Sequence, residues 1–175
     1  EFETLFSGLN YPHGLAIGPD KRVYVGEQDR VWRFSPTDPS STVEEILSGL
    51  PSKSPGHPHL HPLSSFVFDN DGNLILNLGS STDRCETDGS FPSPCSADSP
   101  ESRDAQLWIL TLDGPNYDPG AFRLLAQGLR NSLALAVHPT SGLIVQAENS
   151  IDIWKGTITR TSHDEETALW MSSID

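Results

Sequence analysis

The sequence predicts an all-β fold built from short antiparallel strands and tight turns. A unit of strand, turn, strand and a third strand carrying tryptophan occurs three times, beginning near residues 13, 64 and 133. The turns between the first two strands contain Gly, Asn and Pro, which favour hairpin connections. The composition agrees, because an apolar fraction of 35% with 14 glycines and 14 prolines suits strands and turns better than packed helices.

One strand of each unit is a nearly continuous apolar run. The runs are Val23-Tyr24-Val25, Leu74-Ile75-Leu76 and Leu143-Ile144-Val145. Such runs are typical of strands that are buried on both faces, as when one sheet stacks on the next. We expect the third strands to correspond as well, with equivalent places for Trp32, Trp108 and Trp154.

The spacing of the units indicates a β-propeller. The first step is about 50 residues and the second is nearer 70, and repeats of three or four strands at this period are typical of propeller blades. About three blades are present, whereas a closed propeller needs about four to eight. We therefore expect a partial β-propeller over residues 1–152, a divergent segment over 153–175, and a chain that is a fragment of a longer protein.

The charge and hydropathy exclude two kinds of partner. The net charge is −13, from 11 basic and 24 acidic residues, which argues against nucleic acid or an anionic membrane surface. Solubility of an exported protein is the simplest reason for this charge. No apolar stretch approaches the ~18 residues of a membrane span.

The two cysteines indicate an oxidising compartment. Cys85 and Cys95 lie in a loop rich in Pro, Ser and Asp, with neither a CxxC spacing nor a neighbouring metal ligand. A disulfide that closes this loop is the favoured interpretation. Because the chain begins with Glu-Phe-Glu and shows no signal peptide, the prediction of a secreted, extracellular protein depends on these cysteines.

A histidine-rich segment, GHPHLHPLSS, precedes the apolar strand of the second unit. It contains His57, His59 and His61. Alternating histidines could bind zinc or copper as neutral imidazoles. They could also belong to an ordinary surface loop, or one of them could act at the mouth of the strand. The residues alone leave these three interpretations open.

Two further polar segments flank the strands of the third unit. In GLRNS, Arg130 and Asn131 stand immediately before a strand. The arginine could pair with a carboxylate or reach the surface, or the pair could clamp an anion or a quinone oxygen. Asn149 stands at a strand end, where turn capping and ligand contact are equally open.

Together these segments resemble the sugar dehydrogenases that depend on pyrroloquinoline quinone (PQQ). Within that group the sequence is most similar to the pyranose and sorbosone dehydrogenase branch, which includes secreted fungal enzymes. The resemblance covers about residues 8–152, and GLRN…HP…G…ENSxD is its most specific part. It implies a six-bladed propeller that holds PQQ and calcium over an axial funnel, with a sugar substrate and an electron acceptor as partners.

The resemblance also implies roles for individual residues. His61 would be the general base that takes the proton of a sugar hydroxyl while hydride passes to the quinone, a task that suits a neutral imidazole. Arg130 and Asn131 would contact the quinone, the arginine polarising the carbonyl that accepts the hydride. Asn149 matches a polar position near the cofactor.

The sequence departs from this pattern at several points. Ser64 stands where the family usually has Arg, and Ala134 stands where Gly is common. Further cofactor contacts would come from blades outside residues 8–152, so we expect the isolated chain to be inactive. Two alternatives remain open: a gluconolactonase-like hydrolase with Glu27 and Asn149 around a divalent metal, and a non-catalytic propeller that serves as a binding module.

Overall fold

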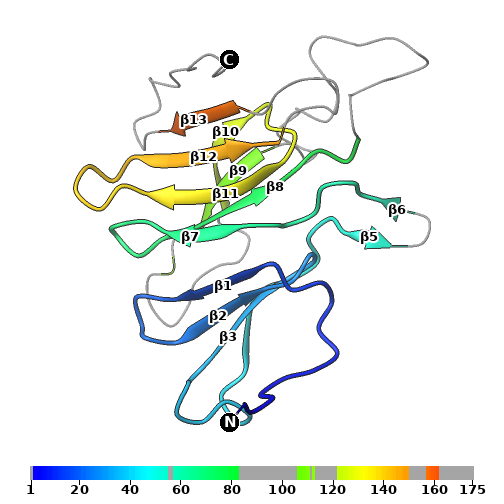
Figure 1. Ribbon diagram of the computed structural model, residues 1–175, viewed down its shortest axis with the longest axis vertical. Helices are drawn as coiled ribbons and strands as arrows, with labels where there is room; N and C mark the ends of the chain where they lie inside the picture. The colour runs from blue at the N-terminus through cyan, green and yellow to red at the C-terminus, as the bar shows by residue number, and fades with distance from the viewer. Residues whose placement is uncertain are drawn as a thin grey trace.

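The computed structural model describes residues 2–54, 57–82, 106–110, 112, 122–149 and 157–161 (Figure 1). Every regular element within these ranges is a β-strand, so the all-β prediction is confirmed for the described part. In the same ranges, no helix is long and apolar enough to cross a membrane.

Within the described ranges, thirteen strands form three larger antiparallel sheets and one short hairpin. The first sheet, in the order β1-β2-β3-β4, comprises Gly14–Ile17, Val23–Gly26, Val31–Phe34 and Glu44–Leu47. The second, from β7 to β10 in sequence, comprises Phe66–Phe68, Leu74–Leu78, Gln106–Leu110 and Phe122–Gln127. The third, in the order β11-β12-β13, comprises Ser132–Val137, Ile144–Glu148 and Thr157–Thr161. The hairpin pairs β5 and β6, which are Lys53–Ser54 and His57–Pro58.

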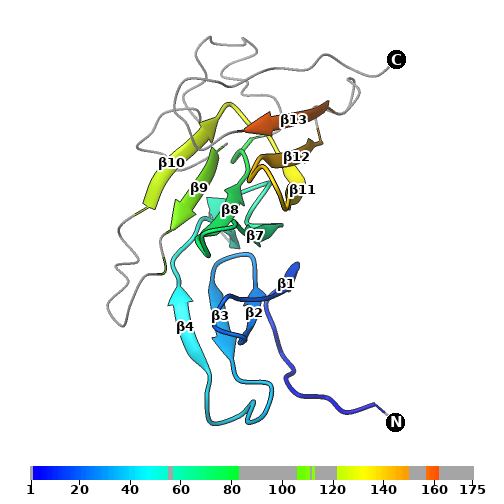
Figure 2. The ribbon, with the colours of Figure 1, turned by 90° about the vertical axis from the view of Figure 1, so that its left-hand side faces the viewer.

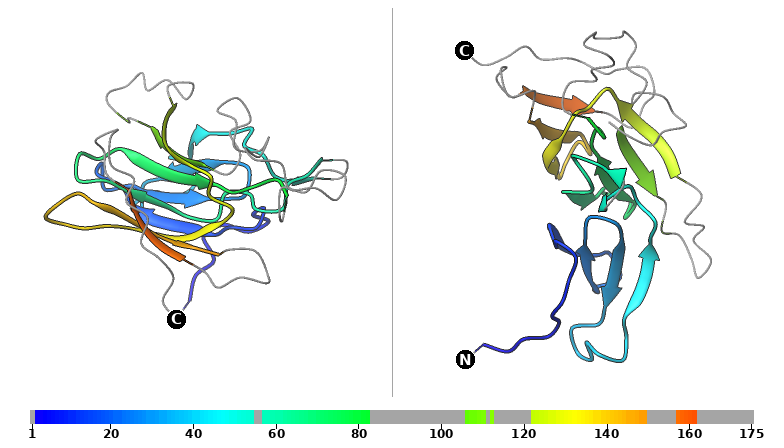
Figure 3. Two further views of the ribbon diagram at one scale, coloured as in Figure 1. Left: turned by 90° about the horizontal axis from the view of Figure 1, so that it is seen from above. Right: turned by 90° about the vertical axis from the view of Figure 1, so that its right-hand side faces the viewer.

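The second sheet lies between the first and the third, as Figures 1 and 2 both show. Its first strand, β7, lies beside the first strands of the other two sheets, β1 and β11. In the right-hand view of Figure 3 the blue strands of the first sheet occupy one end of the molecule and the orange β13 the other. The three sheets therefore meet along their first strands, as expected for units fanned about one axis.

Side-chain alternation along β8 explains why the second sheet can be covered on both faces. Leu74 and Leu76 pack in the cluster shared with the first sheet, whereas Ile75 packs in the cluster shared with the third. All residues of β8 are buried. The prediction of a strand buried on both faces is thus confirmed for the second unit.

Two glycines allow the first and second sheets to approach closely. Gly14 and Gly26 are direct partners across β1 and β2. The ring of Phe66 lies over both, so that a Cβ atom at Gly14 would stand 2.4 Å from its Cε1 atom. A side chain at either glycine would therefore force the two sheets apart.

The expected correspondence of the tryptophans holds for the two that can be placed. Trp32 lies on β3 and Trp108 on β9, the third strand of its sheet in each case. Trp154, Cys85 and Cys95 lie outside the described residues, so the disulfide stays a prediction. The strand suggested by WKGTITR is present as β13, which pairs with β12.

Candidate functional site

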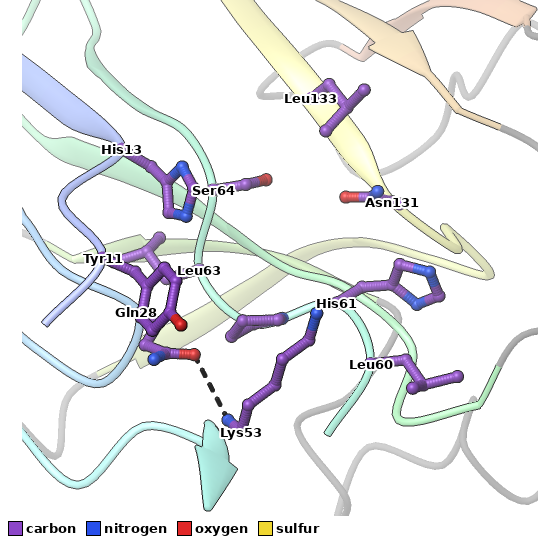
Figure 4. A pocket seen from close by; sticks show the side chains of 11 residues that line it. Tyr11, His13, Gln28, Lys53, Leu60, His61, Leu63, Ser64, Asn131 and Leu133 are labelled. Atoms are coloured by element: carbon purple, nitrogen blue, oxygen red, sulfur yellow. Dashed lines mark hydrogen bonds between the residues drawn. The ribbon is translucent and has the colours of Figure 1, made fainter. Parts of the chain in front are cut away.

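A pocket of about 330 Å³ opens where the first strands of the three sheets begin (Figure 4). Its walls come from the segment before β1, the hairpin β5–β6, the loop before β7 and the start of β11. The lining residues are Tyr11, His13, Gln28, Lys53, Leu60, His61, Pro62, Leu63, Ser64, Asn131 and Leu133. The pocket therefore brings together two of the predicted site residues, His61 and Asn131, from distant parts of the sequence.

The imidazole of His61 is held in a defined orientation. Its Nδ1 atom lies 2.8 Å from the backbone oxygen of Ser80. A carbonyl oxygen can only accept, so Nδ1 carries the proton and the neutral ring has its lone pair on Nε2. This tautomer is the one that a general base needs if it is to receive a proton at Nε2.

The segment Gly79-Ser80-Ser81, which follows β8, ties the walls of the pocket together. The backbone oxygen of Ser80 accepts from His61, and the backbone amide of Ser80 donates to the backbone oxygen of Arg130 at 2.6 Å. The Leu60 amide donates to the backbone oxygen of Ser81. A Cβ atom at Gly79 would stand only 2.5–2.7 Å from His61 and the Arg130 oxygen. Glycine is therefore required here by the close approach of two other segments.

Asn131 is fixed by its backbone and presents its side chain to the pocket. Its amide donates to Glu148 Oε1 at 2.9 Å, and its carbonyl accepts from the amide of Asn149. The residue is 8% exposed, yet among the described residues its Oδ1 atom has no hydrogen-bond partner. A buried amide oxygen without a partner is costly unless a ligand or water satisfies it.

The carboxyl of Glu148 is bonded to the segment that positions Asn131. Burial raises the pKa of its carboxyl above the usual range, although hydrogen bonds from Asn131 and Ser132 and the charge of Arg130 oppose the rise. The Ser132 hydroxyl bonds both Glu148 and the buried Gln146. These contacts make the GLRN segment and the end of β12 one connected unit.

Arg130 and Asn149 contact each other and do not line the pocket. The Nη1 atom of Arg130 donates to the backbone oxygen of Asn149 at 2.7 Å. Asn149 is exposed, and its described bonds are made by its backbone. The two residues lie beside the pocket, next to Asn131, and their assignment to the cofactor stays a prediction.

Lys53 and His13 are pocket residues that the sequence interpretation missed. Lys53 belongs to the hairpin β5–β6, and its side chain extends toward His61 (Figure 4). The backbone amide of Lys53 donates to the side-chain oxygen of Gln28. The side-chain amide of Gln28 in turn donates to Asn10 Oδ1. His13 stands directly before β1, as Asn131 stands before β11, and this shared position was a signal that could have identified it.

Two of the three alternating histidines can be compared, and they occupy different surroundings. His59 is buried and lies outside the pocket lining, whereas His61 is partly exposed within it. The side chain of His57 lies outside what the structure describes. Within the described ranges, no group of three or more His, Cys, Asp or Glu residues could hold a metal ion.

Glu27, the proposed metal ligand of a hydrolase, is engaged in the protein itself. The residue is fully buried, and its oxygens accept hydrogen bonds from the Asn10 amide, the Arg30 guanidinium and the Trp32 indole. Burial alone would raise its pKa, but these donors together hold the pKa below the usual value. Glu27 is therefore a structural carboxylate in the first sheet.

Comparison with solved structures places the fold. No protein-family model and no curated protein matches the sequence. A Trichoderma reesei structure from carbohydrate-active enzyme family AA12 is similar over 95% of this chain and 43% of its own length, with a TM-score of 0.70 and 20% identity. The holo form of the PQQ domain of pyranose dehydrogenase from Coprinopsis cinerea is similar over 85% of this chain and 46% of its own, at a TM-score of 0.55 and 15% identity.

A chain from a nidogen–laminin complex is similar as well, over 85% of this chain and 43% of its own, at a TM-score of 0.50 and 17% identity. The chain thus spans less than half the length of each of these proteins. At such identities the likeness concerns the fold: the chain has the all-β fold of the PQQ domain and of the family AA12 enzyme.

Proposed function

We propose that this chain forms one wall of the cofactor pocket of a PQQ-dependent sugar dehydrogenase with a six-bladed propeller. The observation that carries the proposal is that His61 and Asn131, which two separate sequence motifs single out, line one pocket. The likeness of fold to the pyranose dehydrogenase PQQ domain supports it. Because the chain spans less than half of such proteins, the activity is proposed for the longer protein or assembly that completes the pocket.

The polar groups of the pocket suit an anionic, oxygen-rich ligand. PQQ carries carboxylates beside its quinone oxygens, and Lys53 and His13 are groups that can donate to such oxygens. The buried Asn131 side chain offers an amide N–H at the wall, and its Oδ1, which has no partner among the described residues, can accept from an N–H or hydroxyl of a ligand. None of the described lining residues is a carboxylate that would repel the cofactor.

Lys53 also accounts for the departure at Ser64. Where the family usually has Arg, the Ser64 hydroxyl exchanges hydrogen bonds with Asn77. Lys53 lines the same pocket from the hairpin β5–β6. We propose that it supplies the positive charge that the arginine would have provided.

In the proposed reaction, PQQ would supply, when bound, the centre that accepts a hydride, and with it two electrons, from the sugar. His61 receives the proton of the sugar hydroxyl at Nε2, because its Nδ1 proton is directed to Ser80. Asn131, directly before β11, would hold the edge of the cofactor, and Lys53 would stabilise negative charge on it. Arg130 and Asn149 are proposed contacts on the strength of the motif, Arg130 from beside the pocket. Calcium is implied by the resemblance and is not assigned to described residues.

The proposal is tested in the protein that contains this chain, by sugar-dependent dye reduction with added PQQ and calcium. His61→Ala should lower turnover by about 10²–10⁴, the usual contribution of a general base. His138→Ala is the matched control, because His138 lies in the exposed turn between β11 and β12. Full turnover in the His61 variant would show that another group is the base.

Cofactor binding is measured separately, by titrating PQQ and following its absorbance. Lys53→Met and Arg130→Ala should each weaken binding, whereas Lys21→Met, in an exposed turn of the first sheet, should not. Absence of PQQ binding by the complete wild-type protein would refute the proposal. The isolated chain as a monomer should show neither turnover nor tight binding, since it provides only part of the pocket. Secretion remains a proposal that depends on Cys85 and Cys95.

A further inference from the structure

Gln28 is a buried polar residue that lines the pocket and has no role in the proposed reaction. It stands two residues after the end of β2, and it is only 3% exposed. A buried amide is costly unless its hydrogen bonds are made. Both ends of this amide are bonded, and each end reaches a different segment of the chain.

The nitrogen end of the Gln28 amide faces the segment before β1. Its Nε2 atom donates to Asn10 Oδ1 at 2.9 Å, and the backbone amide of Gln28 donates to the backbone oxygen of Asn10 at 3.3 Å. The backbone amide of Asn10 donates to the carboxylate of Glu27, which the first sheet holds through further bonds. Asn10 is therefore fixed at its nitrogen, its backbone oxygen and its side chain, and it forms a firm support for Gln28.

The oxygen end of the Gln28 amide faces the inserted hairpin β5–β6. Gln28 Oε1 accepts from the backbone amide of Lys53, the first residue of β5, at 3.3 Å, and Figure 4 draws this bond as a dashed line. The side chain of Lys53 is exposed and extends from this point toward His61. The bond thus fixes the place where the lysine side chain starts, and it does not use the ammonium group.

We propose that Gln28 is a positioning residue, which sets the place of the Lys53 side chain in the pocket by joining the hairpin to Asn10. The inference rests on the proposed function, in which Lys53 contacts an anionic ligand. Glutamine suits this place because one amide supplies both an acceptor for Lys53 and a donor for Asn10. Because the lysine stem is flexible, a fixed starting point limits the region that its charge can reach and lowers the cost of ordering it on a ligand.

A double-mutant cycle on PQQ binding tests the proposal in the protein that contains this chain. Lys53→Met should raise the PQQ dissociation constant by about tenfold or more, as expected for the loss of a hydrogen bond to a charged group. Gln28→Met keeps an unbranched side chain of similar length and removes both bonds, and it should raise the constant by about three- to tenfold. In the Lys53→Met background, Gln28→Met should add less than about twofold, because the group that it positions is gone.

Asn73→Ala is the matched control. It too removes a side-chain amide that holds a loop, through the bond from Asn73 Nδ2 to Asp69, but this loop is the β7–β8 turn, outside the pocket lining. It should lower the free energy of unfolding and leave the PQQ dissociation constant unchanged. Circular dichroism checks that each variant keeps its β-structure. If Gln28→Met weakens PQQ binding equally with and without Lys53, Gln28 supports the wall only in general, and the proposal is overturned.

Hydrogen exchange of the Lys53 backbone amide tests the contact itself and needs no ligand. Gln28→Met should speed this exchange by about two- to tenfold, the contribution of one hydrogen bond. Gln28→Glu keeps an acceptor at this place and should retain the wild-type rate, as should Asn73→Ala. An unchanged rate in Gln28→Met, or a Gln28→Glu rate as fast as that of Gln28→Met, would overturn the proposal even if PQQ binds. Expected exchange rates in a protein that does not bind PQQ would instead refute the proposed function and support the role of Gln28 in placing Lys53.

Discussion

Gly79→Ala is the substitution that tests most directly how the pocket is held together. The φ angle of Gly79 lies outside the left-handed region, so an alanine meets no backbone strain there. What it lacks is space: the new methyl carbon would lie 2.5 Å from His61 Cβ, 2.6 Å from the Arg130 oxygen and 2.7 Å from the His61 oxygen. Two of these three atoms belong to the backbone and cannot rotate away.

The expected cost follows from these distances. To restore ordinary contacts of 3.4 Å, the His61 and Arg130 segments must retreat by about 0.7–0.9 Å. Overpacking of this kind costs about 1–3 kcal/mol of unfolding free energy. Loss of the Ser80–Arg130 hydrogen bond adds about 0.5–1.5 kcal/mol, whereas removal of a glycine from the unfolded chain returns about 0.4–1 kcal/mol. A net loss of about 0.5–4 kcal/mol is expected.

Urea denaturation measures the stability, and nitrogen NMR of the imidazoles reports whether His61 keeps its proton on Nδ1. Gly49→Ala is the comparison, because Gly49 has nothing within 4 Å of an added Cβ atom and differs in having a φ of +73°. It should lose stability through backbone strain and leave the His61 signals unchanged. A Gly79→Ala protein as stable as wild type, with unaltered His61 signals, would refute the packing argument.

Two further predictions concern the core and the buried carboxylate. Phe66→Ala should lower the free energy of unfolding, measured by urea denaturation, by about 3–5 kcal/mol, because the ring fills the space over Gly14 and Gly26. A loss smaller than that caused by replacing an exposed phenylalanine with alanine would contradict this. Because the pKa of Glu148 is raised in the folded state, the folded protein binds the carboxyl proton more tightly than the unfolded chain does. The free energy of unfolding should therefore fall as pH rises above about 4.5 through the folded pKa. Glu148→Gln should lack this decline, and an identical pH profile of the urea midpoint in both proteins would show that another group titrates.

The fold was predictable where the hydrophobic pattern alone decides it. Leu74-Ile75-Leu76 predicted a strand buried on both faces, and alternation then places Ile75 against the third sheet and its neighbours against the first. The need for the glycines of the first sheet could not be predicted from the pattern, because Gly14 is required by the ring of Phe66, which belongs to another unit. Such close approaches arise from tertiary packing and leave no periodic signal.

The candidate site was predictable in part, for a similar reason. His61 and Asn131 were identified because they precede strands that belong to the repeat. Lys53 was missed because it lies on the hairpin β5–β6, which is inserted between units. The motif assigned Arg130 to the quinone but gave no sign of its partner within the protein: the guanidinium donates to the backbone oxygen of Asn149.

The charge of the chain and the charge of the pocket have opposite signs, and the local structure explains how both can hold. Glu27 precedes the lining residue Gln28, and Glu148 bonds the lining residue Asn131, yet the oxygens of both carboxylates are directed to N–H and O–H donors within the protein. Lys53, by contrast, is an exposed side chain that lines the pocket and extends toward His61. Repulsion from acidic residues more than about 10 Å away is largely screened at ordinary ionic strength. An anionic cofactor entering this pocket is therefore governed by the lysine and the imidazoles beside it, although the protein as a whole is strongly acidic.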